Sequence, residues 1–242
     1  MKIANKELNL GLYVDKDLFY VKGSAHRVKI PNLDRDLALF LGIVWGDGWL
    51  SQRQKAIKNY SWRVGIVEDD KPLIQHFVNL TDKVFQIKPK LNDRITKIEA
   101  YFSSKIVYEL LTKVYGFPDG YKIGRLRIPN QIIDSAELMA SFLTGIFSTD
   151  GKFVVYKKYP RIGVDSATLI FIEDIKNALL KLKFKPTLYT WTRKKGNNLY
   201  GLYLSGFEQV TMFHKKIGFI GEKANKLEHF LANNAPLRPI AP

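Results

Sequence analysis

An apolar segment that ends in Asp-Gly occurs twice in this chain, about one hundred residues apart. The copies span residues 40–48 (FLGIVWGDG) and 143–151 (LTGIFSTDG). Aligned on Asp-Gly, small residues recur four apart in both: Gly42 and Gly46, then Gly145 and Thr149. Two helices with such faces can approach until their backbones nearly touch. The repeat therefore predicts two helices paired through their small residues.

Pairing of these helices about a two-fold axis would bring their C-terminal acids, Asp47 and Asp150, side by side. A helix C-terminus carries partial negative charge, so two carboxylates there require cations. We interpret both as divalent-metal ligands, with the backbone carbonyls of Gly46 and Thr149 as additional oxygen ligands. A single copy would equally fit an ordinary helix end capped by Asp and Gly. The second copy favours the metal site.

Short markers around the two segments repeat at offsets of 97 to 103 residues. Ile-Pro-Asn at 30–32 returns at 128–130, and Gly-Phe at 116–117 returns at 218–219. Such regularity predicts a duplication with pseudo-two-fold symmetry. We divide the chain into an N-terminal extension (1–26), a first half-domain (27–126), a second half-domain (127–231) and a Pro-rich tail (232–242).

Hydrophobic periodicity changes in the same order in each unit: helix, strand, strand, helix, strand, strand, helix. The predicted class is α+β, with two αββαββα units, each an antiparallel four-stranded sheet backed by helices and joined to its partner through the motif helices. Strands are predicted at 49–54, 59–67, 88–93 and 97–102, then at 152–158, 161–164, 186–193 and 199–204. The last helices are predicted to begin at Ser103 and Ser205 and to end at Gly116 and Gly218.

The core Gly-Ile-x-x-x-Asp-Gly at 42–48 and 145–151 resembles the LAGLIDADG homing endonucleases in their single-chain, two-motif form. The resemblance implies a double-strand DNA break with short 3′ overhangs. It also implies a basic catalytic residue after the last helix of each unit, here Lys122 and Lys223 in short loops. Family members carry a water-orienting polar residue, commonly neutral, at the end of each second strand. Here these positions hold Glu68 and Asp165, which departs from that pattern.

Formal net charge is +15, which suits a polyanionic partner bound in a salt-dependent way, although a lysine-rich surface is also typical of thermophile proteins. The chain has no cysteine, and its four histidines show no zinc spacing. Any metal must be held by oxygen, so we predict Mg²⁺, with Mn²⁺ or Ca²⁺ able to occupy the same sites. No long apolar run or leader is seen, which predicts an intracellular protein, cytoplasmic or organellar, without a membrane partner.

The open faces of the two sheets are predicted to contact DNA, because two-stranded ribbons fit the major groove. The candidate DNA-binding residues are Ser51, Arg53, Arg63, Lys90, Asn92, Arg94, Lys152, Tyr156, Lys158, Arg161, Tyr189, Trp191 and Arg193.

We predict a site-specific double-strand DNA endonuclease that acts as a monomer on a long, asymmetric target, encoded in an intron. One alternative is an RNA-binding intron maturase that uses the same basic surface. Another is a DNA-binding regulator without catalysis, which two acids facing a phosphate backbone argue against. A self-splicing intein is not expected, because the chain lacks a nucleophilic N-terminal block and a His-Asn ending.

Overall fold

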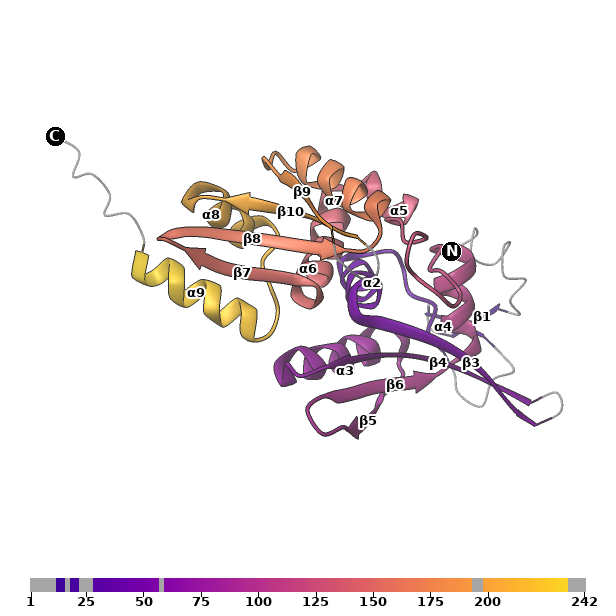
Figure 1. Ribbon diagram of the computed structural model, residues 1–242. Coiled ribbons are helices and arrows are strands. Elements are labelled where there is room, and N and C mark those ends of the chain that lie inside the picture. The colour runs from indigo at the N-terminus through magenta and orange to yellow at the C-terminus, as the bar shows by residue number, and fades with distance from the viewer. Residues whose placement is uncertain (1–11, 16–17, 22–27, 57–58, 193–197, 235–242) are drawn as a thin grey trace.

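The computed structural model describes residues 12–15, 18–21, 28–56, 59–192 and 198–234. Two four-stranded antiparallel sheets flank a central pair of helices (Figure 1). The predicted α+β class is confirmed. The strand order is β3-β4-β6-β5 in the first sheet and β7-β8-β10-β9 in the second, so the two units share one topology.

The first unit runs from α2 to η1 and follows a short hairpin. Its elements are β1 (Leu12–Asp15), β2 (Leu18–Val21), α2 (Arg35–Asp47), β3 (Gly48–Ala56), β4 (Asn59–Glu68), α3 (Lys71–Phe85), β5 (Lys90–Asp93), β6 (Ile98–Ser103), α4 (Lys105–Glu109) and the π-helix η1 (Leu110–Val114). The second unit has α5 (Asn130–Ile133), α6 (Ala136–Thr149), β7 (Gly151–Tyr156), β8 (Tyr159–Ser166), α7 (Leu169–Lys181), β9 (Thr187–Trp191), β10 (Leu199–Ser205), α8 (Phe207–Lys216) and α9 (Glu222–Asn234).

Alternation along the strands decides which face of each sheet is covered by helices. In the first sheet Val64, Ile66 and Phe102 are buried on the helix side, and in the second Ile162 and Leu204 are. Buried apolar side chains from both units form one continuous core. The residues between them in sequence face away from the helices, so each sheet keeps one open face.

Both predicted N-caps of the last helices are wrong by one residue. Ser104 caps α4 with its hydroxyl, and Gly206 precedes α8. The reason is that Ser103 is still paired with Arg63 in the sheet, and Ser205 with Arg161. The strand ladder holds these serines in extended backbone.

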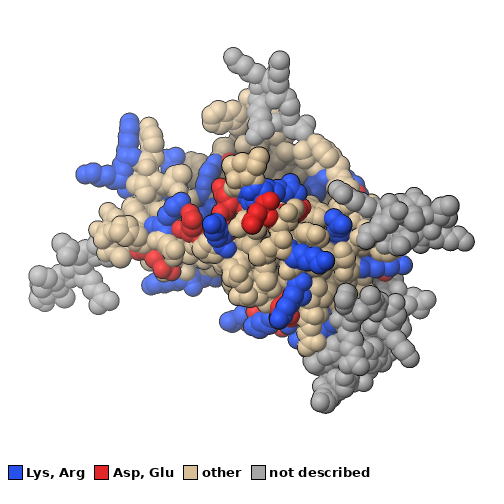
Figure 2. All heavy atoms as spheres, turned by 90° about the horizontal axis from the view of Figure 1, so that it is seen from below, with Lys and Arg blue, Asp and Glu red and all other residues tan. Residues whose placement is uncertain are grey.

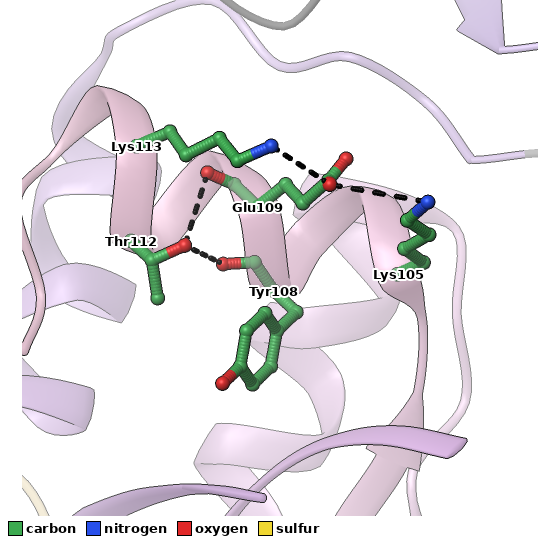
Figure 3. A network of polar contacts seen from close by, with 5 residues as sticks. All are labelled: Lys105, Tyr108, Glu109, Thr112 and Lys113. Atoms are coloured by element: carbon green, nitrogen blue, oxygen red, sulfur yellow. Dashed lines mark hydrogen bonds and ion pairs between the residues drawn. The ribbon is translucent and has the colours of Figure 1, made fainter. Parts of the chain in front are cut away.

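Helix α4 continues into the π-helix η1, and side chains tie its turns together (Figure 3). Glu109 accepts from Lys113 at 2.9 Å and lies 4.0 Å from Lys105, while the Thr112 hydroxyl donates to the Tyr108 carbonyl at 3.0 Å. The Tyr108 hydroxyl donates to Asp119. This contact fixes the start of the loop that leads to Lys122.

Helix α9 was not predicted, and it places Lys223 in a helical first turn rather than in a short loop. The spacing of Leu227, Phe230 and Leu231 carries a helical signal that could have revealed it. The helix also includes residues 232–234 of the predicted tail; the rest of that tail lies outside the described residues. Across the described ranges, no helix is long and apolar enough to span a membrane.

Candidate metal and nucleic-acid site

The two motif helices, α2 and α6, touch through their glycines. A Cβ added at Gly42 would lie 2.0 Å from the Phe142 carbonyl oxygen, and one at Gly145 would lie 2.4 Å from the Ile43 nitrogen. Both neighbours are backbone atoms, so no side chain fits at either position. The predicted contact through small residues is therefore present, and it sets the C-terminal ends of α2 and α6 next to each other.

Three carboxyl groups meet at these helix ends. Asp47 is the last residue of α2, Asp150 caps α6, and Glu68 ends β4 and is hydrogen-bonded to Asp47. Loss of hydration, followed by the charge of Asp47, raises the pKa of Asp150 to about 7, although part of that side chain remains open to solvent. Desolvation and the Asp47 contact raise the pKa of Glu68 to about 8. The folded chain holds protons here that a lone exposed acid would release.

Each motif helix ends against a lysine. The Lys122 ammonium donates to the carbonyls of Gly46 at 2.7 Å and Gly48 at 2.9 Å. The Lys223 ammonium donates to those of Ser148 at 2.8 Å and Thr149. Both lysines are half-buried, and desolvation lowers the pKa of each. Cations at helix C-termini are favourable, so the two lysines also stabilise α2 and α6.

The segments that carry these lysines are anchored on the opposite unit. Near Lys122, the Gly124 amide donates to the Thr168 hydroxyl at 2.9 Å, and Thr168 precedes α7 of the second unit. Near Lys223, the Glu222 amide donates to Asp70 at 2.7 Å, and Asp70 is the N-cap of α3 in the first unit. The anchors occupy equivalent positions. This contact of Asp70 with Glu222 was not predicted from the sequence.

The donor set suits a hard divalent cation. Within the described ranges no cluster of three or more His, Cys, Asp or Glu side chains is arranged to hold a metal. The available oxygens are the carboxylates of Asp47 and Asp150 and the carbonyls of Gly46 and Thr149. Each of these two carbonyls already accepts a hydrogen bond from a lysine ammonium. Mg²⁺ is commonly held by one or two carboxylates, with water and substrate phosphate completing its shell. The metal assignment stays a prediction.

The prediction that Glu68 and Asp165 occupy equivalent positions is wrong by one residue, because strand pairing makes Val67 the counterpart of Asp165 and Ser166 that of Glu68. Glu68 contacts Asp47, whereas Asp165 accepts from the Lys152 ammonium at 2.6 Å and from the Tyr189 hydroxyl. Lys152 thereby neutralises Asp165 on the open face of the second sheet. No counterpart of this ion pair can form in the first sheet, where Trp49 takes the place of Lys152 and Val67 that of Asp165.

Most candidate DNA-binding residues lie on the open sheet faces. Strand pairing sets Ser51 opposite Arg63 and Val154 opposite Arg161. Each arginine lies over a tyrosine, Arg63 over Tyr101 at 5.2 Å and Arg161 over Tyr203 at 5.0 Å. By the same alternation Lys90, Asn92, Lys152, Tyr156, Tyr189 and Trp191 share these faces, and Arg94 follows β5 in register.

Three of the candidates differ from expectation or cannot be placed. Lys158 was predicted in a strand but lies in the β7–β8 turn with a φ of 70°, since the strands are already joined at Tyr156 and Tyr159. Arg53 belongs to β3, but its side chain lies outside the described part, as does Arg193 altogether. Figure 2 shows lysines and arginines spread over one face of the molecule, with Asp and Glu gathered near its middle.

In the absence of divalent metal, stability is expected to fall as the pH rises from about 4 to 8. The pKa values of Asp150 and Glu68 are raised on folding, so between those limits the folded chain binds more protons than the unfolded chain. His76 has a lowered pKa and acts in the opposite direction near its ordinary value. Thermal unfolding at several pH values in EDTA checks this, with the Asp47→Asn/Asp150→Asn variant as control. An equal pH slope in both proteins would contradict it.

The family description "LAGLIDADG-like domain" matches residues 137–218. Among solved structures, the chain is similar to mesophilic variants of the homing endonuclease I-DmoI, with a TM-score of 0.60 and 20% identity over 77% of this chain and 97% of that one. The structure of I-DmoI in complex with DNA and Ca has a TM-score of 0.59 and 18% identity, over 82% of this chain and 99% of that one. I-SmaMI, bound to an uncleaved DNA target with calcium ions, has a TM-score of 0.54 and 12% identity, over 84% of this chain and 93% of that one.

Curated relatives match this chain over only part of their own length. They include the tRNA-splicing ligase RtcB of Methanopyrus kandleri, 24% identical over 81% of this chain and 22% of the relative. The replicative DNA helicase DnaB of a Nostoc species is 27% identical over 82% of this chain and 24% of the relative. The glutamine–fructose-6-phosphate aminotransferase of Methanocaldococcus jannaschii is 26% identical over 84% of this chain and 18% of the relative. The chain thus spans less than a quarter of each.

Proposed function

We propose that this chain, which has the fold of the single-chain LAGLIDADG homing endonucleases, is a site-specific double-strand DNA endonuclease dependent on Mg²⁺. The observation that carries the proposal is the meeting of Asp47 and Asp150 at the ends of two helices in backbone contact, each with a lysine beside it. The same arrangement leaves a basic open sheet face on either side of the acids. I-DmoI and I-SmaMI, which share the fold, have been seen with DNA and divalent metal.

Bound divalent metal would neutralise charge on the attacking and leaving oxygens of the phosphodiester. Asp47 and Asp150 would hold it, one acid for each DNA strand, with Gly46 and Thr149 offering carbonyl oxygens. Lys122 and Lys223 each donate two hydrogen bonds to backbone carbonyls, and a lysine ammonium has three N–H donors. The remaining donor can bind a phosphate oxygen or the attacking water, which steadies charge in the transition state.

The curated relatives point to no enzyme activity that they share. A ligase, a helicase and an aminotransferase have no reaction in common, yet each matches this chain over a minor part of its length. A segment of this kind has the character of an inserted element. The matching segments of the relatives are part of translated polypeptides, so they do not indicate where this gene lies. From the resemblance of the two motifs alone, we propose that the gene is carried in an intron and that the monomeric product recognises a long asymmetric site, the sequence formed where the gene's flanks join.

The direct test is cleavage of a duplex that spans those joined flanks. We expect both strands to be cut with Mg²⁺ and neither with EDTA, as read on a denaturing gel with each strand labelled in turn. Specific binding of that duplex without cleavage in Mg²⁺ or Mn²⁺ would contradict the enzymatic proposal and favour a regulator. Binding of the surrounding intron RNA in preference to the duplex would favour the maturase.

Lys122→Met and Lys223→Met are expected to slow cleavage about 100-fold or more while affinity for DNA changes little. Methionine keeps the stem and removes the charge that acts on the phosphate. Single-turnover cleavage, with the salt dependence of binding measured alongside, checks this. A phosphate-binding role would instead weaken binding and reduce the salt slope by about one. Lys181→Met, at an exposed position at the end of α7, is the control and should cut at the wild-type rate.

A further inference from the structure

The open faces of the two sheets have the same geometry but different chemistry. Ser51 in the first sheet and Val154 in the second each lie opposite the arginine that rests on a tyrosine. On the outermost strands, Asn92 corresponds to Tyr189, and Arg94 to Trp191. At each of these pairs a hydrogen-bonding side chain in the first sheet is replaced by an apolar or aromatic one in the second.

This difference produces a hollow of about 480 Å³ on the second sheet. Its lining consists of Lys152, Val154, Arg161, Gly163, Asp165, Tyr189, Trp191, Leu199 and Tyr203. The hollow depends on Gly201, since a Cβ there would lie 2.3 Å from the Asp165 carboxylate and 2.5 Å from the Tyr189 ring. The equivalent position in the first sheet is Glu99, which accepts from Asn92 at 3.2 Å and Arg94 at 2.7 Å.

Three of the polar groups in the hollow, Lys152, Asp165 and Tyr189, bind one another, while the Arg161 guanidinium rests on the Tyr203 ring. Lys152 donates to Asp165 at 2.6 Å and to the Tyr189 hydroxyl at 3.0 Å. The hollow offers a partner exposed apolar surface, since Val154 is 46% exposed and Trp191 is 67% exposed. Arg161 in the lining and Lys157, which lies over the Tyr156 ring at the end of β7, are basic and suit a polyanion rather than an apolar protein surface.

We propose that this hollow reads thymine 5-methyl groups in the major groove, so that one half of the target is recognised by apolar contact and the other by hydrogen bonds. The proposal rests on the DNA-binding function proposed above. In the major groove only thymine presents a methyl group, and apolar side chains recognise it. In the first sheet Asn92 and Arg94 each give one N–H to Glu99 and keep further N–H donors, which bind adenine and guanine edges.

The test uses the full-length chain with Ca²⁺ and a library of randomised DNA duplexes. We expect selected duplexes to be rich in thymine in one half-site. Replacing a contacted thymine by deoxyuridine removes only the methyl group, and should weaken binding about fourfold for each methyl lost. The same replacement in the other half-site should leave affinity unchanged.

Variants assign the effect to the hollow. In Trp191→Ala and Val154→Ser the penalty for deoxyuridine should disappear, and the exposure of both side chains makes misfolding an implausible cause. The matched control is Arg94→Ala in the first sheet, which should weaken binding through the other half-site and retain the deoxyuridine penalty.

The outcomes separate this inference from the function on which it rests. If no duplex is enriched, the DNA-binding function fails and the inference with it. Specific duplexes whose affinity is indifferent to deoxyuridine in both half-sites would overturn the inference alone. Equal weakening of all duplexes in Trp191→Ala would also overturn it, since the hollow would then contact the DNA backbone.

Discussion

Replacing Asp47 and Asp150 together by asparagine is expected to slow cleavage of both DNA strands by about a thousandfold or more while the duplex is still bound. The amide keeps the shape of each side chain but removes the negative charge that would hold a divalent cation against the scissile phosphates. Binding should be unchanged or slightly tighter, because two carboxylates that repel the phosphates are gone. Relief of the Asp47–Asp150 repulsion should also make the metal-free protein more stable.

Each single variant gives a sharper result. If the two acids serve different strands, Asp47→Asn and Asp150→Asn should convert the enzyme into a nicking enzyme, and the two should nick opposite strands. A plasmid with one target site separates nicked from linear product, and strand labelling identifies the cut strand. Glu228→Gln, at an exposed position of α9, is the control for a lost acid. Wild-type linearisation by the double variant under metal titration would rule out the metal-binding assignment.

Gly42→Ala and Gly145→Ala are expected to destabilise the fold by about 3 kcal/mol or more, a large part of the stability of a typical domain. A methyl group at Gly42 would lie 2.0 Å from a carbonyl oxygen, and one at Gly145 would lie 2.4 Å from an amide nitrogen. Because the neighbours are backbone, no rotamer change relieves the overlap, and α2 and α6 must move apart. This cost exceeds the gain of about 1 kcal/mol in helix propensity from glycine to alanine.

Urea unfolding with and without DNA checks the seam prediction. Asn177→Ala, at an exposed position in α7, gains helix propensity without a clash and should be neutral or stabilising. Where a seam variant still folds, cleavage should fall more than binding, since separation of the helices displaces the acids while each sheet keeps its face. Unchanged unfolding midpoints for both variants would mean that the helices do not pair through these glycines.

The sequence was sufficient to predict the order of elements, because duplicated markers and changes of period report local structure directly. It was also sufficient to bring the acids together, since the spacing of Gly42 and Gly145 before Asp47 and Asp150 defines both the helix face and its end. Some of its errors lie at the boundaries of elements. Ser103 and Ser205 carry the residue type of an N-cap, but strand pairing with Arg63 and Arg161 holds both in the sheets.

The asymmetry between the units could not be predicted from the repeat itself. The aligned sequence copies pair Glu68 with Asp165, but strand register makes Val67 the counterpart of Asp165, so the two acids lie on opposite faces of their sheets. The aromatic hollow likewise required the register of four strands. Helix α9 was missed because its apolar positions are few and follow Gly218, where the last helix of the repeat was expected to stop.

The crossed anchoring of the lysines makes the two halves interdependent. Thr168 of the second unit holds the segment of Lys122, and Asp70 of the first holds the start of α9, next to Lys223. A half-domain produced alone would lack the anchor for its own lysine even if it folded. Chimeric enzymes assembled from halves of different origin should therefore inherit the Asp70 and Thr168 contacts together with the lysines that they hold. When one half is replaced to change the DNA sequence that it prefers, the new half must still supply the anchor residue that holds the lysine segment of the other half.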